Sequence, residues 1–378
     1  MTFSTSKIRS VAAMVVALLL IGCHTGKTPS TKGETSAMRY ATLLRCEQGD
    51  GYTRWTLVNP WDTTEVLHQY VLVPADAELP SALPNGTLIR TPLHRAGVAT
   101  AVHCGMMNEL GCADAITGVC ESQFIDLPVV TRGIADGSIA DFGNGMNPNI
   151  EQIMETQPDV LLLTPFEHSG GYGRVERLGI PIIECAEYME VSPLARAEWL
   201  RFYAVLFGAE AVADSIFASV EKQYNELTTL ASQAPTHPRL LTEMLYGGQW
   251  FVPAGNSTMG MMFSDAAADY VFANLDGSGS TGLSFEAVLE AGEDADIWLI
   301  KVNQSTPYTY QQMEADYNPY THFQAFRNRS IYVCDLAHNH FYEETPFHPE
   351  RLLRDLICIL HPTLLPGQQP VYYKPLDE

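Results

Sequence analysis

The feature that most constrains this chain is a long stretch, 193–233, that carries helix signals and no strand pattern. Ser192-Pro193 predicts the start of one helix and Gly208 its end. A second helix is expected over about 209–231, because apolar residues recur there at spacings of three and four. These residues are Val212, Ile216, Phe217, Val220, Tyr224 and Leu227. Such a helix would be about 35 Å long, which indicates a stiff connector between two other parts of the chain.

Strand and helix patterns alternate on both sides of this connector. Before it, strands are expected over 96–101, 115–119, 160–164 and 180–185, with helices over 106–110 and 150–156. After it, strands are expected over 240–244, 297–302 and 331–334, with helices over 257–273, 284–291 and 349–360. This alternation is typical of parallel sheets covered by helices. The sequence therefore predicts an α/β fold of two Rossmann-like lobes, 91–192 and 236–378, with parallel sheets joined by a single long rigid helix within 193–235.

Residues 38–90 have a different pattern from the two lobes. The runs Tyr52–Asn59 and His68–Val73 are rich in β-forming residues, and Asn-Pro and Pro-Asn-Gly sequences separate the runs in this region. We expect an N-terminal β extension here, packed on the first lobe.

The first residues carry the signals of an exported lipoprotein. Lys7 and Arg9 precede an apolar run, Val11–Ile21, that is too short to span a membrane comfortably. The run ends in Leu-Ile-Gly-Cys23, which resembles a bacterial lipobox. Residues 1–22 are thus predicted to be a signal peptide, Cys23 the lipidated residue, and 23–37 a flexible tether. The expected location is the cell envelope, anchored by lipid on the periplasmic side of a bacterial membrane, with the inner or outer membrane left open.

Composition excludes one class of partner. The chain has 378 residues and a formal net charge of −22, whereas nucleic acid requires clustered Lys and Arg. Hydrophobic residues make up 46% and charged residues 17%, which is typical of a globular protein. The cysteines after Cys23 show no Cys-x-x-Cys spacing, so most are expected to be small buried hydrophobic residues.

One segment occurs twice, once in each predicted lobe. In the first lobe Asn149-Ile150-Glu151 opens a helix that is followed by Asp159, and in the second Ser284-Phe285-Glu286 opens one that is followed by Asp296. In both copies a capping residue precedes an acid in the first helical turn, where a carboxylate interacts well with the helix dipole. Either acid alone would be an ordinary helix-start residue. Their paired placement favours a functional role.

Together these residues resemble the iron-siderophore, haem and cobalamin binding proteins of ABC importers, over roughly residues 91–378. The resemblance is carried by the Asn-x-Glu-x-Ile run with Pro-Asp-Val at 158–160, the connector end 221–224, the Trp-Phe-Val-Pro-Ala-Gly run at 250–255, and the segments 323–332 and 355–362. It implies a substrate-binding lipoprotein, not an enzyme and without a cofactor of its own, that holds an iron or cobalt chelate between its lobes. It also implies that Glu151 and Glu286 dock onto arginines of a permease dimer, which works with a separate ATPase. A monomer is expected.

The carboxyl ends of parallel strands nominate the cleft residues, because ligands of such sheets bind there. The candidates are His103, Phe142, Asn144, Phe166, His168, Tyr172, Glu187, Tyr188, Trp250, Asn256, Lys301 and Tyr342. The aromatic residues could supply flat faces for a chelate. His103 and His168 could be axial metal ligands, although a histidine satisfied by backbone hydrogen bonds is commoner. Some haem-binding relatives place a tyrosine ligand where this chain has Phe142, which weighs against that form of haem ligation.

A second interpretation rests on a cluster near the end of the chain. His338, His340, Glu343, Glu344 and His348 could form a metal site, with His338 and His340 as ligands. That would indicate a surface-anchored metalloenzyme, or a scaffold that binds free metal. The sequence has no Gly-x-Ser-x-Gly, His-Glu-x-x-His or Walker motif, which disfavours an enzyme.

Overall fold

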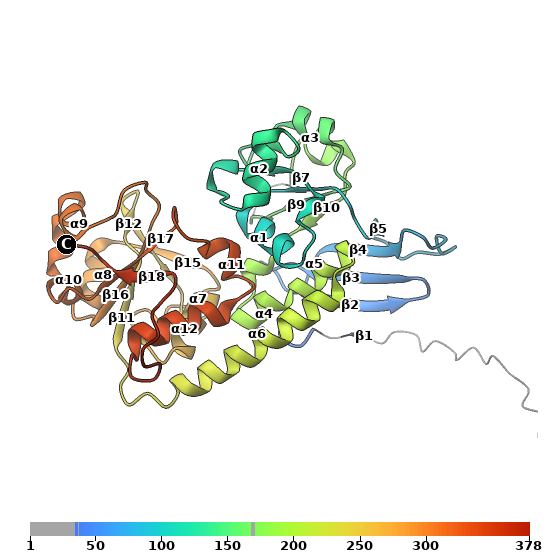
Figure 1. Ribbon diagram of the computed structural model, residues 1–378. Helices are drawn as coiled ribbons and strands as arrows, with labels where there is room; N and C mark the ends of the chain where they lie inside the picture. Colours follow the sequence, from blue (N-terminus) through green and yellow to red (C-terminus); the bar gives the residue numbers. More distant parts are fainter. Residues whose placement is uncertain (1–34, 37, 168–170) are drawn as a thin grey trace, which may run out of the picture. The chain divides into compact units, whose positions relative to one another are not determined.

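The computed structural model describes residues 35–36, 38–167 and 171–378 (Figure 1). The predicted signal peptide 1–22, the lipidation residue Cys23, nearly all of the tether and the ligand candidate His168 lie outside the described residues. In the described part of the chain, no helix combines the length and apolar character needed to cross a membrane.

The first lobe is built on a five-stranded sheet whose strands are all parallel. In sheet order the strands are β10 (Ile182–Glu184), β9 (Val160–Leu163), β6 (Ala96–Val98), β7 (Ile116–Cys120) and β8 (Ala140–Gly143). Its helices are α1 (Ala101–Glu109), α2 (Pro128–Asp136) and α3 (Ile150–Thr156), with short 3-10 turns at 113–115, 122–124, 176–178 and 187–189. Every residue of β7 and β9 is buried, as expected for strands covered by helices on both faces.

The second lobe has a five-stranded sheet and a smaller antiparallel one. The larger sheet is ordered β14 (Asp269–Tyr270), β11 (Arg239–Thr242), β16 (Ile297–Val302), β17 (Ile331–Asp335) and β18 (Tyr373–Pro375), and only β18 runs antiparallel. The smaller sheet is β12 (Leu245–Tyr246), β13 (Gln249–Pro253) and β15 (Ser280–Leu283). The helices are α7 (Thr258–Asp265), α8 (Phe285–Gly292), α9 (Tyr310–Asp316), α10 (Gln324–Arg327), α11 (Phe341–Glu344) and α12 (Pro349–Leu360), with a 3-10 turn at 318–322.

A separate N-terminal sheet precedes both lobes. Its order is β1 (Thr35–Ser36), β2 (Leu44–Gly49), β3 (Tyr52–Val58), β4 (Val66–Pro74) and β5 (Thr87–Thr91), with only the β4–β5 pair parallel. Trp55 and Tyr70 of this sheet pack against Phe202 with ring centroids 5.0 and 5.7 Å apart. Because Phe202 belongs to the connector, the extension shares a core with the first lobe and the connector.

Three helices form the connector: α4 (Pro193–Glu198), α5 (Leu200–Phe207) and α6 (Glu210–Ala231). The Ser192 side chain caps α4, and Gly208 ends α5 in a left-handed conformation with φ of 71°. Along α6, Ala213 belongs to the core of the first lobe, whereas Phe217, Tyr224 and Leu227 belong to the core of the second. The predicted α/β fold, with two parallel-sheet lobes, a long helical connector and an N-terminal β extension, is thus confirmed.

Several elements differ from the sequence prediction. The helix expected over 257–273 ends at Asp265, because Ala267 has a positive φ of 57° and β14 follows. The segment 140–143, where no strand was expected, is strand β8 and carries the buried side chain of Phe142. Helix α2 had no counterpart in the prediction.

Candidate functional site

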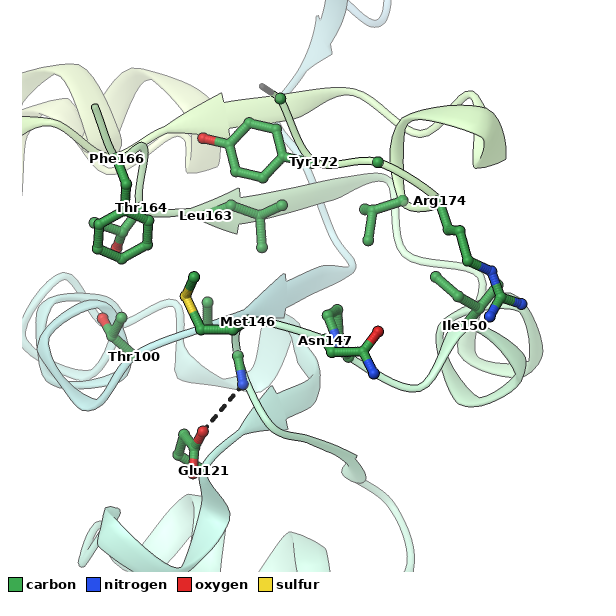
Figure 2. A pocket seen from close by; sticks show the side chains of 16 residues that line it. Thr100, Glu121, Met146, Asn147, Ile150, Leu163, Thr164, Phe166, Tyr172 and Arg174 are labelled. Carbon is green, nitrogen blue, oxygen red and sulfur yellow. Dashed lines mark hydrogen bonds between the residues drawn. The ribbon is translucent and has the colours of Figure 1, made fainter. Parts of the chain in front are cut away.

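A cavity of about 400 Å³, here called cavity 1, lies at the carboxyl ends of the strands of the first lobe (Figure 2). Ala99 and Thr100 follow β6, Glu121 follows β7, and Thr164 follows β9. The other lining residues are Gly145, Met146, Asn147, Pro148, Ile150, Leu163, Phe166, Gly171, Tyr172, Gly173, Arg174 and Val175. This is where an open parallel sheet is expected to bind its ligand, and the volume is typical of small-molecule pockets.

Glu121 fixes one wall of cavity 1. It leaves β7 with a left-handed φ of 52°, and its carboxylate accepts hydrogen bonds from the Asn144 amide at 2.8 Å and the Gly145 backbone N–H at 3.1 Å. Figure 2 shows the bond from the loop backbone to Glu121. The Asn144 side chain in turn accepts from the Met146 backbone N–H at 2.9 Å. The loop that carries Met146 and Asn147 is therefore held in place at the cavity.

The cavity offers apolar and aromatic surface with a few polar groups. Phe166 is 46% exposed and Met146 is 74% exposed, which is high for such side chains. In Figure 2, Phe166, Leu163 and Tyr172 lie along one side of the cavity, and Met146 and Asn147 lie on the other. Burial and the charge of Glu184 raise the pKa of Tyr172, so its ring is a neutral phenol at neutral pH. Such walls suit a flat, largely apolar molecule.

A second cavity, of about 320 Å³ and here called cavity 2, lies between the connector and the second lobe. Arg196 reaches it from α4, Lys301 from β16 and Tyr342 from α11. The remaining lining residues are Pro193, Glu243, Phe251, Pro253, Thr258, Met259, Met262, Ser280, Phe341, Thr345, Pro346, Pro349 and Leu352. Two predicted cleft residues, Lys301 and Tyr342, thus line cavity 2, while Phe166 and Tyr172 line cavity 1.

His103 and Glu187 are placed in a buried polar cluster, which corrects their assignment to the cleft surface. The His103 ring contacts the Thr100 hydroxyl at 2.6 Å and a carboxylate oxygen of Glu187 at 3.4 Å. The Tyr203 hydroxyl donates to the other oxygen of Glu187 at 2.8 Å. Both ring nitrogens of His103 therefore face groups of the protein, so it is a structural histidine and not an accessible metal ligand.

Burial disfavours the charged forms of His103 and Glu187, but the attraction between the two charges outweighs the effect of burial. The pKa of His103 is lowered by burial but raised by Cys185 and Glu187, with a net rise to about 10. The pKa of Glu187 is raised by burial but lowered by His103, Arg196 and Tyr203, with a net fall to about 2. At neutral pH the pair is therefore an imidazolium and a carboxylate.

Phe142 and Trp250 also prove to be core residues, which corrects two further cleft assignments. Phe142 is 2% exposed, and its ring lies against Gly97 and Gly118, where an added Cβ would meet ring atoms at 2.9 and 2.0 Å. Trp250 is fully buried, donates from its indole to the Thr242 carbonyl at 2.9 Å and stacks on another tryptophan, Trp298. For Phe142, the sequence signal was the glycine within each of the strands β6 and β7, because a strand glycine leaves room for a large neighbouring group.

The remaining predicted cleft residues lie outside the linings of both cavities. The Asn144 amide donates a hydrogen bond to Glu121, which itself lines cavity 1. The Tyr188 hydroxyl donates to the Pro165 carbonyl at 2.7 Å, and the Asn256 amide lies 3.5 Å from Asp276. Sequence reasoning missed several lining residues: Thr100, Glu121, Met146, Asn147, Arg174 and Arg196. The strand-end rule could have found Thr100 and Glu121, since both come directly after buried strands.

The paired acids Glu151 and Glu286 are exposed in the first turns of α3 and α8. The Asn149 side chain accepts from the backbone N–H of Glu151 at 3.0 Å, and the Ser284 side chain accepts from Ala287 at 3.2 Å. Both caps are as predicted. The docking role of the two acids stays a prediction.

The histidine cluster near the end of the chain is not assembled into a metal site. His338 is 58% exposed and pairs with Asp335 at 2.8 Å, whereas His348 is buried between Glu109 at 3.6 Å and Glu350 at 3.0 Å. Within the described residues, no group of three or more His, Cys, Asp or Glu side chains could hold a metal ion. The assignment of His338 and His340 as ligands is corrected, because the turn after β17 directs His338 to Asp335 and the start of α12 places His348 between Glu109 and Glu350.

Two parallel-sheet lobes, a helical connector and a cavity at the strand ends define a two-lobed binding protein. A sequence model of the family described as periplasmic binding protein matches residues 104–337, and the chain belongs to this family. Its members are solute-binding proteins.

The chain is also similar to individual proteins in sequence and in structure. An uncharacterized lipoprotein of Methanocaldococcus jannaschii is 26% identical over 303 residues, which cover 76% of this chain and 70% of that relative. A periplasmic haem binding protein from Pseudomonas aeruginosa matches with a TM-score of 0.59 and 16% identity, over 76% of this chain and 99% of that chain. A molybdate periplasmic binding protein from Haemophilus influenzae matches with a TM-score of 0.58 and 15% identity, over 73% and 89% of the two chains. At these identities the two structures establish the shared fold.

Proposed function

We propose that this protein captures a metal chelate in cavity 1 and delivers it to the permease of an ABC importer. The observation that carries the proposal is cavity 1 itself, at the strand ends of a solute-binding fold and walled by exposed Phe166 and Met146. Aromatic and apolar walls with a few polar anchors suit chelates of iron or cobalt, such as haem, a corrinoid or a ferric siderophore. The haem binding protein of the same fold supports this class of ligand.

The polar groups at cavity 1 would orient such a ligand. The Thr100 and Thr164 hydroxyls and the Asn147 amide can each hydrogen-bond a chelate edge, and Arg174 can pair with an acidic substituent. Binding requires no covalent step. The protein would act as a carrier without a cofactor of its own.

The proposed location is the cell envelope, with a lipid on Cys23 that tethers the protein to the membrane. The lipobox-like Leu-Ile-Gly-Cys23 sequence supports this location, as does the relative named a lipoprotein. A tethered carrier stays close to its permease, which raises the effective concentration of the loaded protein there. Glu151 and Glu286, one on each lobe, would contact the two permease subunits.

The experiment that tests the proposal is a calorimetric and absorbance titration of the protein that begins after the tether. The ligands are haemin, cyanocobalamin and a ferric hydroxamate. We expect one of them to bind with a submicromolar dissociation constant. The Phe166→Ala and Tyr172→Ala variants should weaken that binding at least about tenfold, or 1.4 kcal/mol, because each removes an aromatic face of the cavity.

Tyr246→Ala is the matched control, because Tyr246 is an exposed aromatic residue that lines neither cavity. It should bind as the wild type does. If none of the ligands binds, or if binding is indifferent to Phe166 and Tyr172, the chelate does not occupy cavity 1 and the proposal fails.

A further inference from the structure

The two lobes meet directly as well as through the connector. Helix α1 of the first lobe lies against α11 of the second (Figure 1). The contact brings backbone against backbone, because a Cβ added at Gly105 of α1 would collide with the carbonyl oxygen of Glu343 on α11. Glycine, which has no side chain, permits so close an approach. The position of one lobe relative to the other is therefore set at this contact too.

Phe347, which lies between α11 and α12, extends the contact between the lobes. It is 2% exposed and belongs to the hydrophobic core of the first lobe, although α11 and α12 on either side of it pack in the core of the second. Its ring meets that of Tyr203, on the connector helix α5, edge-on, with ring centroids 6.0 Å apart. This apolar contact holds the start of α12 at the first lobe.

Charged groups of both lobes face one another next to Phe347. Glu109 is the last residue of α1, and its carboxylate lies 3.6 Å from the His348 ring and 3.9 Å from a guanidinium nitrogen of Arg351. His348 directly precedes α12, and Arg351 lies in the first turn of that helix. Two basic groups of the second lobe thus oppose one carboxylate of the first.

The charges of this group depend on the two lobes staying together. Burial lowers the pKa of His348, but Glu109 and Glu350 raise it, with a net rise to about 9. The contact with His348 lowers the pKa of Glu109. At neutral pH the pair is therefore an imidazolium and a carboxylate. Separation of the lobes would take one of two carboxylates away from His348, which is 7% exposed, and a buried charge is costly to leave unpaired.

The second-lobe side of the contact is held in place by its own partners. His348 Nδ1 lies 3.0 Å from Glu350, and Arg351 lies 2.9 Å from Glu344. His348 Nε2, which faces Glu109, is buried and has no hydrogen-bond partner among the described residues. Its distance of 3.6 Å to the Glu109 carboxylate is slightly longer than a hydrogen bond. A small approach of the first lobe would complete this bond, whereas any retreat would weaken it.

We propose that Glu109, His348 and Arg351 form a latch between the lobes, which limits how far the lobes can separate. The latch holds α3 and α8 at a defined spacing, because one helix belongs to each lobe. It does not depend on which ligand binds, so its test is separate from that of chelate capture.

Distances between spin labels on the two lobes of the full chain test the latch. Labels attached through unnatural amino acids at Met154 of α3 and Glu290 of α8, which are both exposed, avoid the cysteines of the protein. We expect a narrow distance distribution for wild type. Glu109→Gln removes the charge but keeps the size of the side chain, and it should broaden the distribution and lengthen its mean by more than about 2 Å, the scale of domain rearrangements.

Two further variants separate charge from shape. Arg351→Gln should shift the distribution in the same direction but by less, because the buried His348 still faces Glu109. Glu109→Asp keeps the charge but draws it back by one methylene, so its distribution should fall between those of wild type and Glu109→Gln.

Glu47→Gln is the matched control, because Glu47 is partly exposed and pairs with Arg54 inside the N-terminal sheet. It should give the wild-type distribution. Thermal unfolding of each variant shows whether it is folded, and Arg351→Gln tests the latch independently if Glu109→Gln is not. The proposal is overturned if the folded latch variants keep the wild-type distribution, or if Glu47→Gln broadens it as much as they do.

Discussion

His103 and Glu187 show how single residues can be misplaced by sequence reasoning. Each is polar, follows a strand or opens a helix, and belongs by that rule at the ligand site. The structure instead buries both, with Thr100, Tyr203 and Arg196 as their partners. A buried ion pair of this kind contributes little net stability, but loss of one partner strands the other charge at a cost of about 3–5 kcal/mol.

The His103 pair makes stability depend on pH in a defined direction. The pKa of His103 is about 10 in the folded protein, above the value of about 6.5 for an unfolded chain. The stabilisation is therefore complete below pH 6.5 and is lost as the pH rises toward 10. We expect His103→Gln to lower the free energy of unfolding at pH 6 by on the order of a few kcal/mol more than it does at pH 10. Urea denaturation at both pH values measures this.

His237→Gln is the control for this experiment, because His237 is exposed and its ring contacts the Ala267 backbone carbonyl at 2.9 Å rather than a carboxylate. Its effect should be small and equal at the two pH values. An equal loss at both pH values in His103→Gln would show that His103 contributes by packing alone and carries no charge.

At the scale of elements, the segment 39–43 is bound by two buried carboxylates, Glu198 of the connector and Glu190 just before it. Glu198, the last residue of α4, accepts hydrogen bonds from the backbone N–H groups of Arg39, Tyr40 and Ala41 at 2.9, 2.7 and 2.9 Å. Glu190 accepts from Thr42 and Leu43 in the same way. The segment that comes after the tether is therefore attached to the helices between the lobes.

Removal of Glu198 should release this segment. Its carboxylate satisfies three backbone donors at once, and hydrogen bonds to charged groups contribute about 1.5–3 kcal/mol each. We expect Glu198→Ala to lower the free energy of unfolding by at least about 2 kcal/mol and to speed amide hydrogen exchange at residues 39–41. Exchange measured by mass spectrometry, with the exposed Glu226→Ala as control, tests this. Unchanged exchange at 39–41 would contradict the role given to Glu198.

How far the sequence predicts these elements depends on whether the signal is local. Caps, breakers and periodicity located α3, α6 and α12 to within a residue or two at each end, because Asn149, Gly208 and Pro349 act on their own backbone. The predicted cleft residues Phe166 and Tyr172 line cavity 1 for a similar reason, because the end of β9 sets where the chain after it begins. The cleft assignments of Phe142, Trp250 and His103 were wrong because the surroundings of these residues come from strands and helices distant in sequence. No local sequence pattern records such surroundings.

At the scale of the whole molecule, the two lobes each present one capped helix with an exposed acid in its first turn. Glu151 lies on α3 of the first lobe and Glu286 on α8 of the second. Exposed ion pairs add little affinity each, but a pair of charges fixed on two rigid lobes selects orientation and speeds association. The acids are therefore suited to set the register of docking while leaving ligand binding alone.

Charge reversal at Glu151 and Glu286 distinguishes permease docking from ligand binding. We expect Glu151→Lys with Glu286→Lys to reduce chelate uptake at least about tenfold in cells that carry only this variant, since like charges would then oppose the arginines proposed on the permease. The isolated variant should bind its chelate with unchanged affinity, because neither acid lines cavity 1. Asp50→Lys with Glu226→Lys changes the net charge equally at exposed positions, so its uptake should match wild type and exclude a general effect of charge. Normal uptake by the Glu151 and Glu286 variant would show that docking uses another surface, whereas equal loss in both double variants would show that overall charge governs association.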